Sequence, residues 1–237
     1  MAFFNLLYQD RISINDNISV MIPKVDDILK CEEDYYRLVA VLTSVPYDMM
    51  VQLDDLGIDF TKINEYELFL LLFGGLRSED THLIFGDLNL SGFETVINPQ
   101  NNTVVLRDQE TGIVIDRAIH AKIANALRMI HHLEKTVKKP GNDEAREYLI
   151  ERTRKKIARS KFKQNTSELE SLITAMVNTS EFKYDYESVK TISIYQFNQS
   201  VHQIIRKTDW DNRMHGIYAG TVDAKRLSEH DLSWFSR

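Results

Sequence analysis

The sequence has little of what crosslinks or bends a protein chain. Its 237 residues include one cysteine, Cys31, together with four prolines and nine glycines. A single cysteine cannot form a disulfide within the chain, so the sequence favours a reducing, intracellular compartment. The acidic residues after Cys31 raise a thiol pKa, so we expect an ordinary helix thiol rather than a nucleophile. The low glycine and proline content favours long helices joined by modest loops.

Long apolar runs are also absent from the sequence. The longest strongly apolar run, residues 68–73, is far shorter than the roughly 20 residues that span a lipid bilayer. The first residues, 1–8, are apolar but have neither a basic flank nor a small-residue cleavage site, so we expect no signal peptide. The sequence therefore predicts no membrane partner.

Motifs that carry catalysis or bind metals are missing as well. There is no glycine-rich phosphate loop, no Gly-x-Ser-x-Gly, no His-Glu-x-x-His and no Cys-x-x-Cys. His131 and His132 are neighbours that point in different directions on a helix, so we interpret them as solvated or interface histidines. We predict a protein without catalytic residues, metal or cofactor, and not an enzyme. An active site assembled only by the fold is the alternative, because motif reading does not detect one.

The residues that are present predict an α+β fold that is predominantly helical. Hydrophobic residues make up 43% and charged residues 27%, which is close to a globular average. Alternating residues at 11–15 and 18–22 predict an N-terminal hairpin. Helical periodicity follows over 23–42, and a shorter helix begins at Pro46. Asn64 and Glu67 form a capping box before a helix that is apolar nearly all round, so we expect it to be buried and to end at Gly74-Gly75.

The middle of the chain changes to short segments rich in β-branched and aromatic residues. These lie at 83–85, 93–97, 103–106 and 113–115, and they predict a small antiparallel β-meander. A helical stripe returns over 119–133 and ends at a Pro-Gly turn within a run of charges. We therefore predict an N-terminal α+β domain over 1–139 and a C-terminal helical domain over 140–237, which begins with a basic helix.

Charge is divided unevenly along the chain, which has a formal net charge of −6. Residues 1–66 carry 5 basic and 12 acidic side chains, whereas residues 135–163 carry 11 basic and 4 acidic ones. Such opposed segments predict a contact between segments, between subunits or with a charged partner. Charge alone does not choose among these.

The basic helix, expected from about 143 to 163, holds the main candidate partner-binding residues. These are Arg152, Arg154, Lys155, Lys156 and Arg159. We interpret them as a solvated face or as a surface that docks on an acidic partner. The alternative is a nucleic-acid-binding protein that uses the basic 135–163 segment to contact phosphates. Little aromatic interleaving and the acidic overall charge count against that alternative.

Trp234 and Phe235 are further candidate partner-binding residues near the end of the chain. An aromatic pair offers a large apolar area to a partner. We favour the simpler interpretation, in which the pair pins the end of the chain to the core.

Several stretches resemble proteins encoded beside tail genes in phages and prophages of Gram-positive bacteria. They lie at 57–73, 182–186 (Phe-Lys-Tyr-Asp-Tyr), 194–204, 216–220 and 232–234. The shared feature is a pattern of packing residues that spans most of the chain, and no binding residue of the family carries over. The resemblance implies a tail assembly chaperone or a tail or baseplate structural component, located in the host cytoplasm or in the virion. It implies phage tail or other virion proteins as partners, together with self-association.

Overall fold

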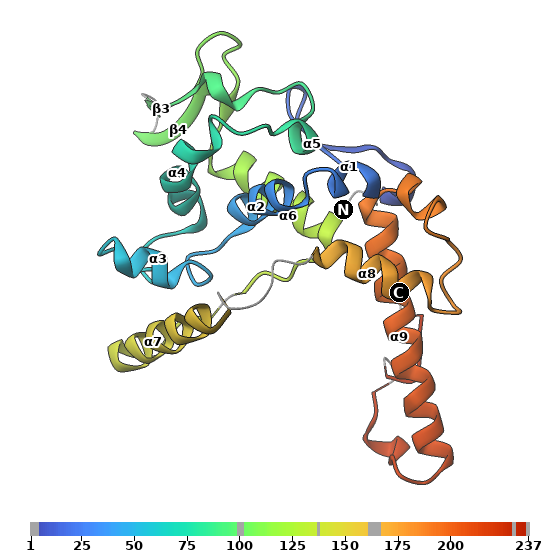
Figure 1. The fold of residues 1–237 in the computed structure, drawn as a ribbon. Helices are drawn as coiled ribbons and strands as arrows, with labels where there is room; N and C mark the ends of the chain where they lie inside the picture. Colours follow the sequence, from blue (N-terminus) through green and yellow to red (C-terminus); the bar gives the residue numbers. More distant parts are fainter. Residues whose placement is uncertain (1–4, 99–101, 137, 161–166, 229–230, 236–237) are drawn as a thin grey trace.

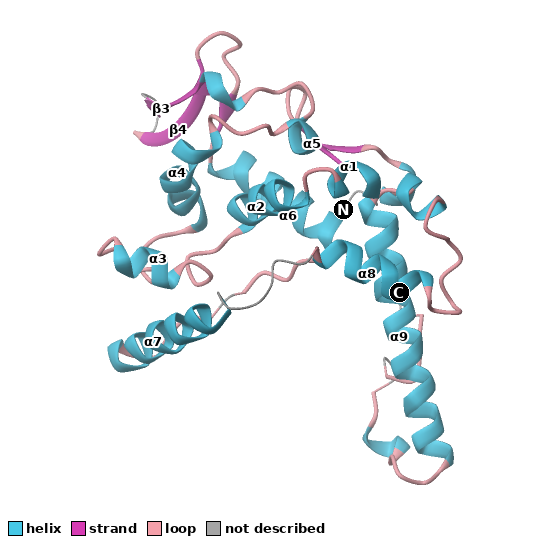
Figure 2. Ribbon diagram, viewed as in Figure 1, coloured by secondary structure: helices cyan, strands magenta, loops and turns pink. Residues whose placement is uncertain are grey.

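The computed structural model describes residues 5–98, 102–136, 138–160, 167–228 and 231–235 (Figure 1). Helices dominate, with a two-stranded hairpin near the N-terminus and a three-stranded antiparallel sheet in the middle of the chain (Figure 2). The predicted α+β, mainly helical fold class is confirmed. The strands are β1 (Arg11–Ser13), β2 (Ser19–Met21), β3 (Phe93–Asn98), β4 (Thr103–Asp108) and β5 (Val114–Ile115). The helices are α1 (Val25–Leu29), α2 (Glu32–Thr43), α3 (Met50–Asp55), α4 (Glu65–Leu76), α5 (His82–Phe85), α6 (Arg117–His131), α7 (Asp143–Ser160), α8 (Glu168–Val177) and α9 (Ile194–Tyr218).

The N-terminal hairpin forms where the alternating pattern predicts it. Ile12 lies opposite Val20 in the antiparallel β1–β2 pair, and both side chains are buried. The turn is held by Asn15, whose side-chain oxygen accepts hydrogen bonds from the backbone N–H groups of Asn17 and Ile18. An asparagine that bonds its own backbone is typical of such turns.

The meander has three strands in the order β3-β4-β5. Phe93, Leu106 and Ile115 are buried on one side of it. The sequence also predicted a strand at residues 83–85. That prediction is wrong, because these residues form part of the short helix α5. Ile84 and Phe85 are consecutive and both buried, and a strand would turn such neighbours to opposite faces.

The expected helix over 23–42 is two helices rather than one. The helix is interrupted at Cys31, whose backbone is non-helical. Helix α1 therefore ends at Leu29, and α2 begins three residues later at Glu32. The break lets Ile28 of α1 and Tyr35 of α2 both enter the core.

Helix α4 begins as predicted, with the capping box between Asn64 and Glu67 complete in both directions. Two further expectations for it are wrong. It continues through Gly74 and Gly75 to Leu76, and Leu71 is 54% exposed, so the helix is not buried all round. Its apolar residues divide between two clusters instead.

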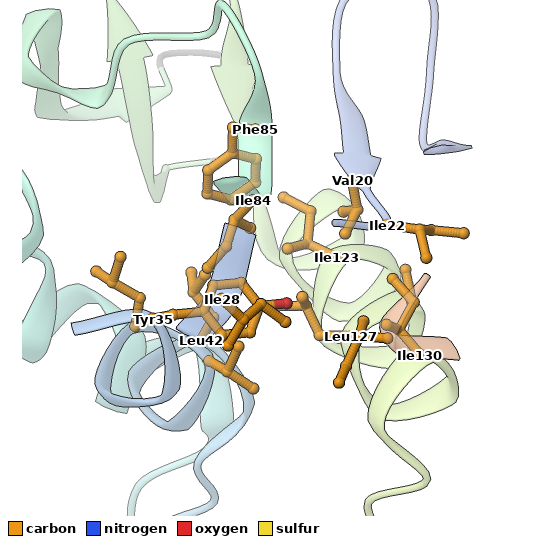
Figure 3. Packing of buried hydrophobic residues seen from close by; sticks show 14 of the residues in the cluster. Val20, Ile22, Ile28, Tyr35, Leu42, Ile84, Phe85, Ile123, Leu127 and Ile130 are labelled. Atoms are coloured by element: carbon orange, nitrogen blue, oxygen red, sulfur yellow. The ribbon is translucent and has the colours of Figure 1, made fainter. Parts of the chain in front are cut away.

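The largest apolar cluster is centred on α6. Ile123, Leu127 and Ile130 of α6 face residues from the hairpin, α1, α2 and α5 (Figure 3). Phe197 of α9 is fully buried in the same cluster, and the Ile194 N–H donates to the Pro23 carbonyl at 2.8 Å. Side chains from both sides of residue 139 therefore share this cluster, while the predicted domain boundary stays a prediction.

Candidate partner-binding surfaces

Helix α7 docks on the body through one apolar face. Ile150 is buried there against a second apolar cluster, and Leu149 and Ile157 pack beside it. The cluster is completed by side chains of α3, α4 and the segment between them, namely Met50, Val51, Leu53, Phe60 and Leu68. Figure 1 shows α7 lying near α3 and well apart from α8 and α9. The contact with the body is therefore local.

Ion pairs flank this apolar contact at both ends. Arg146 binds Asp59 at 2.6 Å, and Arg154 binds both Asp54 at 2.9 Å and Asp55 at 2.7 Å. Hydrogen bonds from the Thr61 hydroxyl and backbone, helped by the nearby Arg146 charge, lower the pKa of Asp59 to about 2. Part of the basic segment thus binds the acidic N-terminal region of the same chain.

This docking divides the candidate residues on α7 into two groups. Arg154 is on the docked face, whereas Arg152, Lys155, Lys156 and Arg159 follow an i, i+3, i+4, i+7 pattern on the exposed face. The sequence does not distinguish Arg154 from the other four candidates, because the aspartates that bind Arg154 lie about a hundred positions earlier.

The exposed face of α7 borders a shallow groove. Arg152, Lys155, Lys156 and Arg159 line it together with Tyr47, Asp48 and Tyr148. Lys155 forms an ion pair with Glu151 at 2.6 Å. Within the described part of the chain, Arg152, Lys156 and Arg159 have no ion-pair partner. The groove therefore combines free cations with Tyr148, an aromatic side chain that is 63% exposed.

The other two candidates lie on an arm formed by the distal half of α9 and the segment that returns along it. The Trp210 ring N–H donates to the Leu232 carbonyl at 3.0 Å, and the Gln203 amide donates to the Trp234 carbonyl at 3.1 Å. Trp234 is 36% exposed and Phe235 is 68% exposed. The expectation that this pair pins the chain end to the core is wrong, because polar bonds to the backbone hold the segment on α9 instead.

The two histidines at the end of α6 differ in exposure, since His131 is half-buried and His132 is exposed. The His131 Nε2 lies 2.9 Å from the Tyr35 hydroxyl, and burial lowers the pKa of His131 to about 4. His132 stacks on Tyr195 and His202. Among the residues with described positions, no three histidine, cysteine or acidic side chains are grouped to hold a metal ion. None of the described helices is long and apolar enough to cross a membrane.

Comparison with known proteins adds one finding. Residues 161–237 match the family model described as the YomV second domain, a family named after a Bacillus prophage-type gene product. No curated protein and no solved structure is significantly similar to the chain. The matched segment includes α8, α9 and the arm. Through its C-terminal part, the chain is similar to a phage-associated family.

Proposed function

We propose that this protein is a non-enzymatic phage morphogenesis protein that acts through protein–protein contacts in tail assembly. It would serve either as an assembly chaperone for a tail protein or as a tail or baseplate component. The similarity of residues 161–237 to a phage-associated family supports the setting. The observation that carries the proposal is the exposed face of α7, where three cations without an ion-pair partner in the described chain border a groove.

The binding mode follows from how α7 is held. Its docked face uses Ile150, Arg146 and Arg154 to hold the helix on the body, so the residues that line the groove would be in place before a partner arrives. A preorganised face loses little conformational entropy on binding. Arg152, Lys156 and Arg159 would attract an acidic protein surface, while Tyr148 would bury apolar area at the centre of the contact.

The exposed arm offers a second contact. Phe235, Tyr218 and Trp234 present aromatic area to solvent on this arm, and Figure 1 shows α9 lying apart from α7. Two separated surfaces would allow the protein to hold one partner at two points, which raises the effective affinity without new contacts at either one.

The proposal is tested by affinity capture from phage-induced cells beside mass spectrometry of purified virions. We expect a tail protein in the captured material. High copy number in virions identifies a structural component, whereas absence from virions identifies an assembly chaperone. A protein that captures no virion protein and is absent from virions contradicts the proposal.

A second candidate function, nucleic-acid binding, is favoured by the same row of cations. Arg152, Lys156 and Arg159 repeat along one helix face and would meet successive phosphates, with Tyr148 exposed for base stacking. Binding through these residues would weaken steeply with salt, and replacing all three with alanine would reduce the salt slope by about 3. Binding without that change rejects this candidate.

A further inference from the structure

A second cavity lies apart from the exposed face of α7, between the start of α4, the start of α6 and the side chains of Lys135, Thr136, Lys138 and Lys139. Its volume is about 380 Å³, which is within the range of small-molecule sites. Tyr47 lines both this cavity and the groove beside α7. The lining has three chemically different parts, and together they indicate what kind of molecule fits.

The first part is an aromatic wall. Phe60 and Tyr66 are buried, and the ring of Tyr47 meets that of Phe60 edge-on at 6.2 Å. The Tyr66 hydroxyl donates to the Ile115 carbonyl at 2.7 Å, which fixes its ring in place. A wall of this kind favours a flat ring, because aromatic faces and edges attract one another.

The second part is a group of cations. Lys135 binds the Glu65 carboxylate, and Arg128 also reaches it at 3.5 Å. Arg117, Lys138 and Lys139 line the same cavity and have no ion-pair partner in the described chain. Since the only acidic side chain of the lining is already neutralised, the cavity has excess positive charge and favours an anionic group.

The third part is a pair of hydrogen-bonding groups deeper in the lining. Glu65 is mostly buried and offers carboxylate oxygens as acceptors. His120 is 3% exposed, and its Nε2 is a buried atom without a hydrogen-bond partner among the described residues. Burial lowers the pKa of His120 to about 4, so the ring is neutral at pH 7. Buried polar atoms without a partner are rare, and this one lies in a residue that lines the cavity.

We propose that this cavity binds a nucleoside monophosphate. The base would lie against Tyr47, Phe60 and Tyr66, and the phosphate would contact Arg117, Lys138 and Lys139. The ribose hydroxyls would donate to Glu65. An inorganic anion would use only the cations, and an uncharged nucleoside would use only the wall and the carboxylate.

Isothermal titration calorimetry on the full chain tests this with AMP, GMP, CMP and UMP, and with adenosine and inorganic phosphate. We expect at least one monophosphate to bind more tightly than both adenosine and phosphate. The variant Arg117→Ala/Lys138→Ala/Lys139→Ala should weaken that binding by about tenfold or more, because charged hydrogen bonds are lost. These side chains lie at the surface, so the variant should keep the fold, which circular dichroism checks.

The variant Lys122→Ala/Lys183→Ala/Lys225→Ala removes the same charge outside the cavity and should leave the affinity unchanged. The proposal is overturned if no monophosphate binds at millimolar concentration, or if phosphate alone binds as tightly as the nucleotides. It is also overturned if both variants weaken binding equally, since the effect would then come from overall charge.

Discussion

At the scale of single residues, the local environment gives His131 and Gly92 properties that their sequence neighbours do not reveal. His131 ends α6 and packs against α2, where its ring lies 5.6 Å from that of Tyr35 and 5.7 Å from that of Tyr36. Gly92 lies against the carboxylate of Asp108, which accepts hydrogen bonds from the backbone and hydroxyl of Thr111. Both positions lead to a direct prediction.

His131 should make stability depend on pH below neutrality. Its pKa is about 4 in the folded protein against 6.5 as the ordinary value, so the unfolded state binds more protons between these limits. The stabilisation is complete above about pH 6.5 and is lost as the pH falls toward 4. The variant His131→Phe should therefore lose less stability than the wild type between pH 7 and pH 5, as measured by urea unfolding.

Tyr35→Phe is the control for this prediction. It removes the hydrogen bond to His131 at a cost of about 1 kcal/mol but leaves the ring buried. Because burial is the main cause of the lowered pKa of His131, this variant should keep the pH dependence of the wild type. An unchanged pH dependence in His131→Phe would contradict the assignment.

Gly92→Ala should destabilise the fold by about 1–3 kcal/mol, the usual cost of overpacking. A Cβ at this position would overlap the Asp108 carboxylate, and that side chain is only 7% exposed and held by Thr111. Gly74→Ala is the matched control, because a Cβ there meets nothing within 4 Å and the position is helical. The control should stabilise by about 0.5–1 kcal/mol in urea unfolding. Equal effects in the two variants would refute the packing argument.

At the scale of elements, the sequence predicted those features that depend only on residues close together along the chain. The capping boxes at Asn64 and Ser193 are both complete, because each needs only residues three positions apart. The strand predicted at 83–85 is wrong, since three apolar residues are too few to show a period. The return of the C-terminal segment onto α9 depends on Trp210 and Gln203 bonding distant carbonyls, which no local pattern reveals.

Helix α7 should loosen when its ion pairs are reversed. Arg154→Glu places a carboxylate opposite Asp54 and Asp55, so two attractive contacts become repulsive ones. We expect amide hydrogen exchange over residues 143–160 to rise by roughly two- to tenfold.

Adding Asp54→Lys and Asp55→Lys to the same chain restores opposite charges and should bring the exchange back down. This return to slow exchange would identify the ion pairs as the cause, because two further substitutions would not rescue a general loss of stability. If the combined variant exchanges as fast as Arg154→Glu alone, the ion pairs do not hold α7.

At the scale of the whole molecule, the opposed charge segments meet within one chain. Lys135 binds Glu65, Arg146 binds Asp59, and Arg154 binds Asp54 and Asp55. The charge pattern allowed a contact between segments, between subunits or with a charged partner. The contact between segments is therefore present. The sequence predicted this complementarity but not which cations remain free, because that depends on how α7 is rotated on the body. The remaining cations, Arg152, Lys156 and Arg159, line the groove beside Tyr47 and Asp48, and the proposed function rests on them.

The most direct test of this account compares what three proteins capture from phage-induced cells. The variant Arg152→Glu/Lys156→Glu/Arg159→Glu reverses the exposed face of α7, and Lys24→Glu/Lys122→Glu/Lys183→Glu makes the same charge change away from both α7 and the arm. We expect the wild type and the second variant to capture the same tail protein, and the first variant to lose it. Capture of that protein by all three, at equal yield, would contradict the claim that α7 carries the partner-binding surface.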